Sequence, residues 1–161
     1  MRTKAALKRN SALRATIPYS AAKQIGILFT VEDTLKHQLI KDFIHKLQRE
    51  GKEVHVLEFL PKKKDNPEFM FDFFTIEDLN FWGKVNSASA EKFSKINFDY
   101  LFNVDTQTNP LIFNMLANCK AHCRVGRFDQ TSSPYFELMI ETNGSVQTLI
   151  DNMYTYTKQL R

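Results

Sequence analysis

The sequence predicts an α/β fold: a three-layer, Rossmann-like sandwich around a mostly parallel sheet. Segments of strand pattern and helix pattern alternate along the chain, and the clearest strands are short apolar runs typical of strands buried on both faces. The 161 residues fit one compact domain, and 43% hydrophobic against 25% charged residues excludes a disordered or fibrous chain. We expect a single α/β domain at residues 24–161, preceded by a leader arm at residues 1–23.

The first half of the domain has the pattern of a crossover unit. An apolar run at residues 24–30 predicts a buried strand. A helix follows, with Asp33 or Thr34 at its cap, because the apolar residues at positions 35–47 recur at helical period and Gly51 suits the residue after its end. Residues 54–59 predict the second strand. Since the connection is a helix, the two strands are expected to run parallel.

The same alternation continues to the end of the chain. Asn109 and Pro110 suit the cap and first turn of a helix, and the alternating pattern at residues 136–141 is typical of an edge strand, for which an antiparallel direction remains open. Gly126 is interpreted as a turn residue. The predicted elements are a strand at residues 98–104, a helix at 111–118, a strand at 122–125, the edge strand, and a final helix after Gly144 and Ser145.

Residues 61–94 are the least regular part of the sequence. Here we expect a small helix at residues 76–82, capped by Thr75. Aromatic residues cluster in this region, and they either pack in the core and a lid or form an exposed surface for a ligand or partner. The pattern leaves both interpretations open. The aromatic residues are Phe69, Phe71, Phe73, Phe74, Phe81 and Trp82.

The net charge of +4 is unevenly distributed, because residues 1–23 contain six bases and no acid while the rest is mildly acidic. The arm is expected to be a short amphipathic helix or a frayed segment, and contact with a membrane surface or with nucleic acid is a weaker alternative. Its apolar stretches are too short for an export signal, and none in the chain reaches a membrane span, so we expect a cytoplasmic protein. The candidate contact residues are Arg2, Lys4, Lys8, Arg9 and Arg14.

The candidate ligand site lies in the loops that follow three predicted strands. In an open α/β sheet, ligands bind outside the carboxyl ends of the strands, where the strand order reverses. We therefore expect residues 30–34, 105–109 and 126–130 to lie side by side along one rim and to bind a polar ligand or perform acid–base chemistry. The candidate ligand-binding residues are Thr30, Asp33, Asp105, Thr106, Asn109, Arg127 and Asp129.

Several common chemistries lack their motifs. The turn after the first strand contains no glycine, which disfavours a dinucleotide fingerprint or a P-loop. Cys119, His122 and Cys123 do not provide a zinc ligand set, and we expect the cysteines to be buried, reduced thiols. Residues 132–134 read as a turn and not as a nucleophile elbow. We predict no catalytic residue, cofactor or metal.

Five segments of the chain resemble an uncharacterised family of small bacterial proteins, a domain of unknown function. The likeness covers nearly the whole chain, the basic arm included, and implies a free-standing bacterial protein with no assigned activity. The segments are residues 25–29, 73–84, 98–101, 125–128 and 135–140.

Residues 97–126 are also similar to the amino-terminal half of heptosyltransferase-type (family 9) glycosyltransferases. The similarity rests on a strand ending in Asp105, an apolar helix, and the Arg124-Val125-Gly126 stretch. In that family this half binds the acceptor sugar, and a second domain binds the nucleotide-sugar donor. The likeness places Asp33 near the catalytic base position, but the family's glycine–aspartate turn and a donor domain have no counterpart here.

Three hypotheses follow for the function. We favour a non-catalytic module that binds a small polar ligand or a protein partner. A group-transfer half-domain completed by another polypeptide is the second hypothesis, and it requires Asp33, Asp105 and Arg127 to converge with their reactive atoms free. A peripheral binder of nucleic acid or membranes through the arm is the third. The edge strand and the aromatic segment are also compatible with a homodimer.

Overall fold

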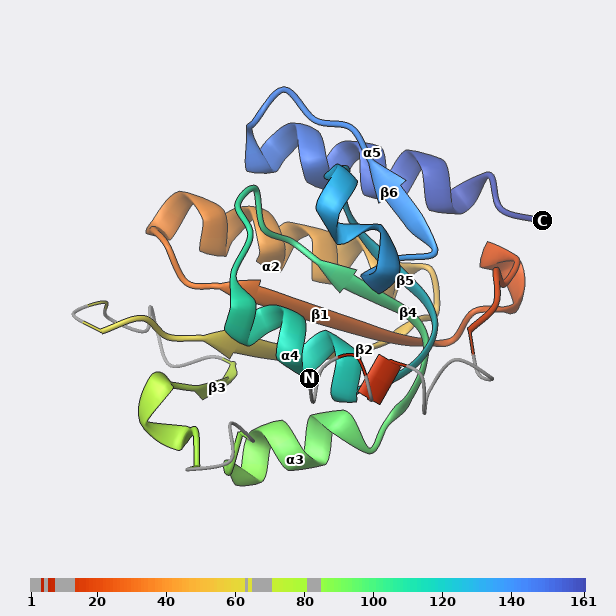
Figure 1. Cartoon of the computed structure of the whole chain (residues 1–161). Helices are drawn as coiled ribbons and strands as arrows, with labels where there is room; N and C mark the ends of the chain where they lie inside the picture. Colours follow the sequence, from red (N-terminus) through yellow and green to blue (C-terminus); the bar gives the residue numbers. More distant parts are fainter. Residues whose placement is uncertain (1–3, 5, 8–13, 63, 65–70, 81–84) are drawn as a thin grey trace.

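A computed structural model describes residues 4, 6–7, 14–62, 64, 71–80 and 85–161. These residues form a six-stranded, all-parallel sheet with the strand order β3-β2-β1-β4-β5-β6 (Figure 1). This confirms the predicted three-layer α/β fold. The strands are β1 (Gln24–Thr30), β2 (Glu53–Phe59), β3 (Asp72–Phe74), β4 (Asn97–Asn103), β5 (Lys120–Arg127) and β6 (Leu138–Ile140).

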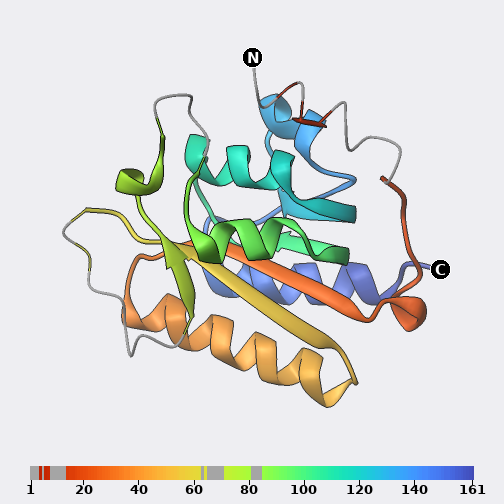
Figure 2. The same ribbon diagram turned by 90° about the horizontal axis from the view of Figure 1, so that it is seen from below.

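Helices cover both faces of the sheet (Figure 2). Helices α2 (Thr34–Arg49) and α5 (Val146–Lys158) pack on one face, where they share a core with Ile25, Ile27 and Phe29 of β1. Helices α3 (Ala88–Ser94) and α4 (Pro110–Asn118) pack on the other face against Leu28 and its neighbours. Burial on both faces explains why β1 is a continuous apolar run in the sequence.

Several predicted elements differ in detail from the observed ones. Edge strand β6 is shorter than expected and pairs with β5 in parallel, so the antiparallel alternative is wrong. Gly126 lies inside β5 and not in a turn. The predicted helix at residues 76–82 is observed as the 3₁₀ helix η4 (Ile76–Asp78), with Thr75 in a capping box. Residues 132–134 belong to another 3₁₀ helix, η5 (Gln130–Tyr135), and a further one, η2 (Tyr19–Ala21), precedes β1.

The aromatic segment divides between the core and the surface. Phe74 is buried, Phe71 is half-buried and Phe73 is exposed. Phe69 and residues 81–82 lie outside the described residues. Packing in the core is therefore confirmed for Phe74, while a role of the segment as a surface for a ligand or partner stays a prediction.

The described part of the arm packs on the domain. Ala6 and Leu7 are buried with Ala117, and the peptide N–H of Ala15 donates to the His122 carbonyl. Arg14 forms an ion pair with Glu137, whose carboxylate also accepts the peptide N–H of Arg124. The candidate contact residue Lys4 is exposed, while Arg2, Lys8 and Arg9 lie outside the described residues.

A buried arginine joins α4 to β5. The Arg124 guanidinium is fully buried and donates to the carbonyls of Leu116, Cys119 and Ala121. Carbonyls at the end of a helix lack partners within it, so the guanidinium satisfies groups that burial would otherwise leave unpaired. This contact holds β5 against α4. No described helix is long and apolar enough to cross a membrane.

Candidate functional site

The candidate site lies where the strand order reverses, between β1 and β4. Strands β2 and β3 lie on one side of β1, while β4, β5 and β6 lie on the other. The carboxyl ends of parallel neighbours meet at one edge of the sheet, so the three predicted loops follow one another along the edge to which the β1 arrowhead points (Figure 1). The sequence therefore predicted the rim correctly, since it follows from the alternation of strands and helices.

Asp105 is the centre of a hydrogen-bond network at this edge. One carboxylate oxygen accepts the peptide N–H of Thr30 at 2.8 Å and the Lys36 amine at 2.7 Å. The other accepts the Thr30 hydroxyl at 3.0 Å and the Asn103 amide at 3.2 Å. The side chain is only 5% exposed. Both oxygens are thus occupied by groups of the protein itself.

Lys36 is the site residue that sequence reasoning missed. It lies in the first turn of α2 and is 3% exposed, with its amine paired to Asp105 and Glu32 and donating to the Thr30 carbonyl at 2.8 Å. A lysine in the first turn of a helix is normally solvated. Leu35 is the converse case: the apolar stripe of the helix predicts that it is buried, but its side chain is 69% exposed. The sequence feature that points to a paired Lys36 is its spacing of four residues from Glu32, which allows an ion pair between the two side chains.

Two cavities open on this rim. One has a volume of about 330 Å³ and is lined by Thr30, Glu32 and residues 105–110. The other, of about 380 Å³, is lined by Thr106, Arg127, Phe128, Glu141, Thr142 and Gly144. Thr106 lines both, so the cavities are neighbours. Thr106, Thr108 and Arg127 are at least partly exposed there, and their hydroxyl and guanidinium groups can meet a ligand.

The hydrogen bonds that Arg127 forms with other described residues are long. Its guanidinium donates to the Phe128 carbonyl at 3.3 Å and to the Thr108 hydroxyl at 3.5 Å. Within the described part of the chain it has no carboxylate within ion-pair distance, although Glu141 lines the same cavity. The guanidinium therefore keeps most of its hydrogen-bonding capacity for a ligand.

The other candidate carboxylates have local structural roles. Asp33 is the N-cap of α2 and accepts the Lys36 peptide N–H at 2.8 Å. Asp129 accepts the hydroxyls of Ser132 and Thr131, and these hydrogen bonds hold the pKa of its carboxyl below the ordinary value. Asn109 caps α4 and donates to the Thr30 hydroxyl at 3.1 Å. These contacts shape the rim.

The cysteines do not contribute to this rim. Both are buried thiols outside any disulfide, and burial raises the pKa of Cys119 and of Cys123 to about 12, because the thiolate loses its solvation. The thiolate is the reactive form, so both side chains are inert near neutral pH. The described residues contain no group of three or more histidine, cysteine or acidic side chains that could hold a metal ion.

A family model matches residues 1–160. The chain belongs to DUF6913, a family of unknown function. This confirms the resemblance to an uncharacterised family. No curated protein matches the chain.

Among solved structures, the DUF6913 chain is similar to a family 9 glycosyl transferase from Veillonella parvula DSM 2008. The two share 14% sequence identity with a TM-score of 0.50, over 92% of this chain and 44% of the other. This agrees with the resemblance noted above and shows a shared fold. The chain spans less than half the length of that structure.

Proposed function

We propose that the protein is a binding module that holds a small polar ligand on the rim formed by the carboxyl ends of β1, β4 and β5. The observation that carries this proposal is the pairing of Asp105, whose two oxygens are occupied by Thr30, Lys36 and Asn103. A general base needs a free lone pair directed at substrate. Asp105 is therefore a structural support for the rim.

The rim itself offers groups that suit a hydroxylated or anionic ligand. Thr106 and Thr108 provide hydroxyls, Gln107 and Asn109 provide amides, and Arg127 provides a planar cation whose internal contacts are long. The adjoining cavities of about 330 and 380 Å³ each fall in the usual range for small-molecule sites. Polar convergent groups around a concave surface favour ligand recognition.

The group-transfer hypothesis has less support. It needs Asp33, Asp105 and Arg127 to act together, but Asp33 caps a helix and Asp105 is fully paired. The fold shared with a glycosyl transferase does not supply these roles, because one fold hosts many functions. A half-domain of this kind would also need its reactive groups from another polypeptide.

The test is a titration of the ¹⁵N-labelled chain with a neutral hexose, a hexose phosphate, an amino acid and a nucleotide. We expect saturable amide shifts at residues 106–109 and 127 with at least one probe, which stays chemically unchanged after prolonged incubation. Arg127→Gln should weaken binding of an anionic probe about tenfold, the value of a charged hydrogen bond. Lys120→Gln is the matched control, because Lys120 is exposed at the opposite end of the same strand.

Shifts confined to other surfaces, or conversion of the probe by the isolated chain, contradict the proposal. Equal losses in Arg127→Gln and Lys120→Gln point to a general effect of charge and not to a site.

A further inference from the structure

Strand β2 has an open edge near its amino end. Its pairing with β1 extends over the whole strand, but β3 pairs only with residues 57–59. The Glu53 N–H donates to the Lys23 carbonyl in line with β1, so the main-chain groups of odd-numbered residues face β1 and those of even-numbered residues face away. The N–H groups of Val54 and Val56 therefore point outward before β3 begins, and no described strand covers them.

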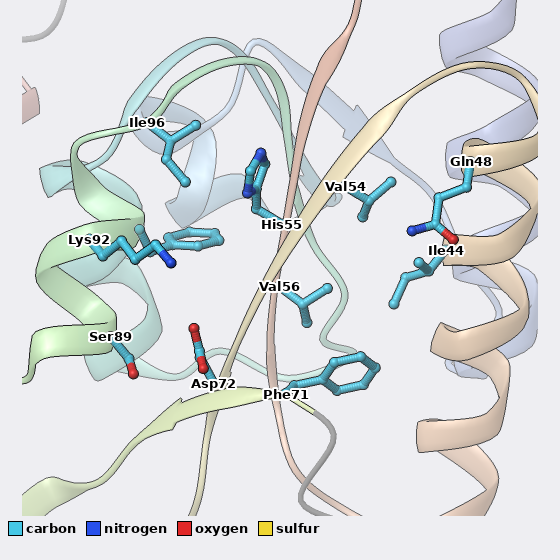
Figure 3. Close-up of a pocket in the computed structure, with 11 residues that line it drawn as sticks. Ile44, Gln48, Val54, His55, Val56, Phe71, Asp72, Ser89, Lys92 and Ile96 are labelled. Carbon is cyan, nitrogen blue, oxygen red and sulfur yellow. The ribbon is translucent and has the colours of Figure 1, made fainter.

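A groove of about 310 Å³ runs along this edge (Figure 3). Ile44 and Gln48 of α2 form one wall, next to the half-buried side chains of Val54 and Val56. The other wall is formed by α3. The side chain of His55 lies on this wall, because it points to the face of the sheet opposite to that of Val54 and Val56. The lining residues on α3 are Ser89, Lys92, Phe93 and Ile96.

The groove contains one lysine and one aspartate, so its charges distinguish where an acidic side chain of an occupant can lie. Figure 3 shows the Lys92 amine and the Asp72 carboxylate pointing into the groove, Lys92 from the last turn of α3 and Asp72 from the start of β3. Lys92 forms no ion pair with a described residue. An acidic side chain beside Lys92 is thus favoured, whereas one beside Asp72 is repelled.

We propose that the open edge of β2 receives an extended segment of a partner protein, which adds a strand to the sheet and alternates apolar with acidic side chains. Main-chain hydrogen bonds to Val54 and Val56 supply the pairing. Because side chains alternate along a strand, apolar residues fall on the wall of Ile44, and acidic residues fall on the wall of Lys92. This surface is separate from the rim site and does not depend on its ligand.

The test uses two synthetic octapeptides, one alternating valine with glutamate and one alternating valine with lysine, added to the ¹⁵N-labelled chain. The glutamate peptide is expected to shift the amides of residues 54–56 saturably and to bind at least tenfold tighter than the lysine peptide. Lys92→Glu should reverse this order. Lys95→Glu is the matched control, since Lys95 is the exposed C-cap residue of the same helix, is absent from the groove lining and should leave the order unchanged.

A second variant removes the backbone donor. Val56→Pro deletes an outward N–H but no hydrogen bond to β1, and proline is tolerated at strand edges. It should abolish binding while the far-ultraviolet circular dichroism and the unfolding transition remain those of a folded chain.

Three results overturn the proposal. In the first, neither peptide shifts the edge amides. In the second, the amides of Val54 and Val56 are already protected from exchange in the free monomer, so the chain covers its own edge. In the third, the chain forms a dimer that Val56→Pro disrupts, so a second copy is the occupant.

Discussion

At the scale of single residues, the ion pair of Lys36 and Asp105 joins two distant segments of the chain in the interior. Both side chains are almost fully buried, and the pair connects α2 to the end of β4. Removing one member of such a pair leaves an uncompensated charge in the interior, which typically costs about 3–5 kcal/mol. The pair therefore fixes the geometry of the rim, and the stability of the fold depends strongly on the presence of both side chains.

Asp105→Asn should lower the free energy of unfolding by about 3 kcal/mol, because the Lys36 amine loses its buried counter-ion. Urea denaturation measures this change. Lys36→Met combined with Asp105→Asn should recover much of the loss, since no unpaired charge then remains in the interior and the Glu32 carboxylate is exposed to solvent. A loss below about 1 kcal/mol in the single variant contradicts the structural role assigned to Asp105.

Glu58 is a buried carboxyl that the rim does not use. It is fully buried in β2, and neither oxygen has a hydrogen-bond partner in the described structure. Burial raises its pKa from 4.5 to about 7, because the charged form loses its solvation. The folded state therefore binds the proton more tightly than the unfolded state.

The stability that this proton provides is present below pH 4.5 and is lost as the pH rises from 4.5 to about 7. The difference of about 2.5 pKa units corresponds to about 3 kcal/mol. Glu58→Gln should remove this dependence, so that it stabilises the chain relative to wild type more at pH 7.5 than at pH 5. Urea denaturation at the two values checks this. Parallel pH profiles for both proteins count against an unpaired, buried Glu58.

At the scale of elements, tertiary packing determines the presence of α3 and the direction of β6, which the local sequence pattern does not predict. Helix α3 was missed because it has only seven residues and buries only Ala90 and Phe93, too few for a helical stripe. The direction of β6 was open because alternation reports an edge position and not an orientation. Strand β1, by contrast, matches its predicted bounds, since burial on both faces leaves a distinct apolar run.

Gly126 illustrates the same limit. It looked like a turn residue, yet it lies in β5 because the Phe136 ring occupies the space of a side chain there. A Cβ at this position would lie 2.3 Å from the ring. Gly126→Ala should therefore destabilise the chain by about 1–3 kcal/mol, measured by urea denaturation. Phe136→Leu, added to that variant, is expected to restore part of the stability, and a neutral Gly126→Ala contradicts the close contact.

At the scale of the whole molecule, the location of the rim was more predictable than the contacts of its residues. Alternating strands and helices place the ends of β1, β4 and β5 on one edge, so the rim follows from topology alone. The roles of individual residues depend on contacts between distant segments, such as the 69 residues that separate Lys36 from Asp105. No local pattern reports such a contact.

The central claim is that the rim binds a small polar ligand and leaves it chemically unchanged. A crystal structure of the chain soaked in a mixture of small polar metabolites tests this directly. We expect density against Thr106, Thr108 and Arg127, with Asp105 still bonded to Thr30 and Lys36. Density elsewhere, or an Asp105 carboxylate released from Lys36 and directed at the bound molecule, contradicts it.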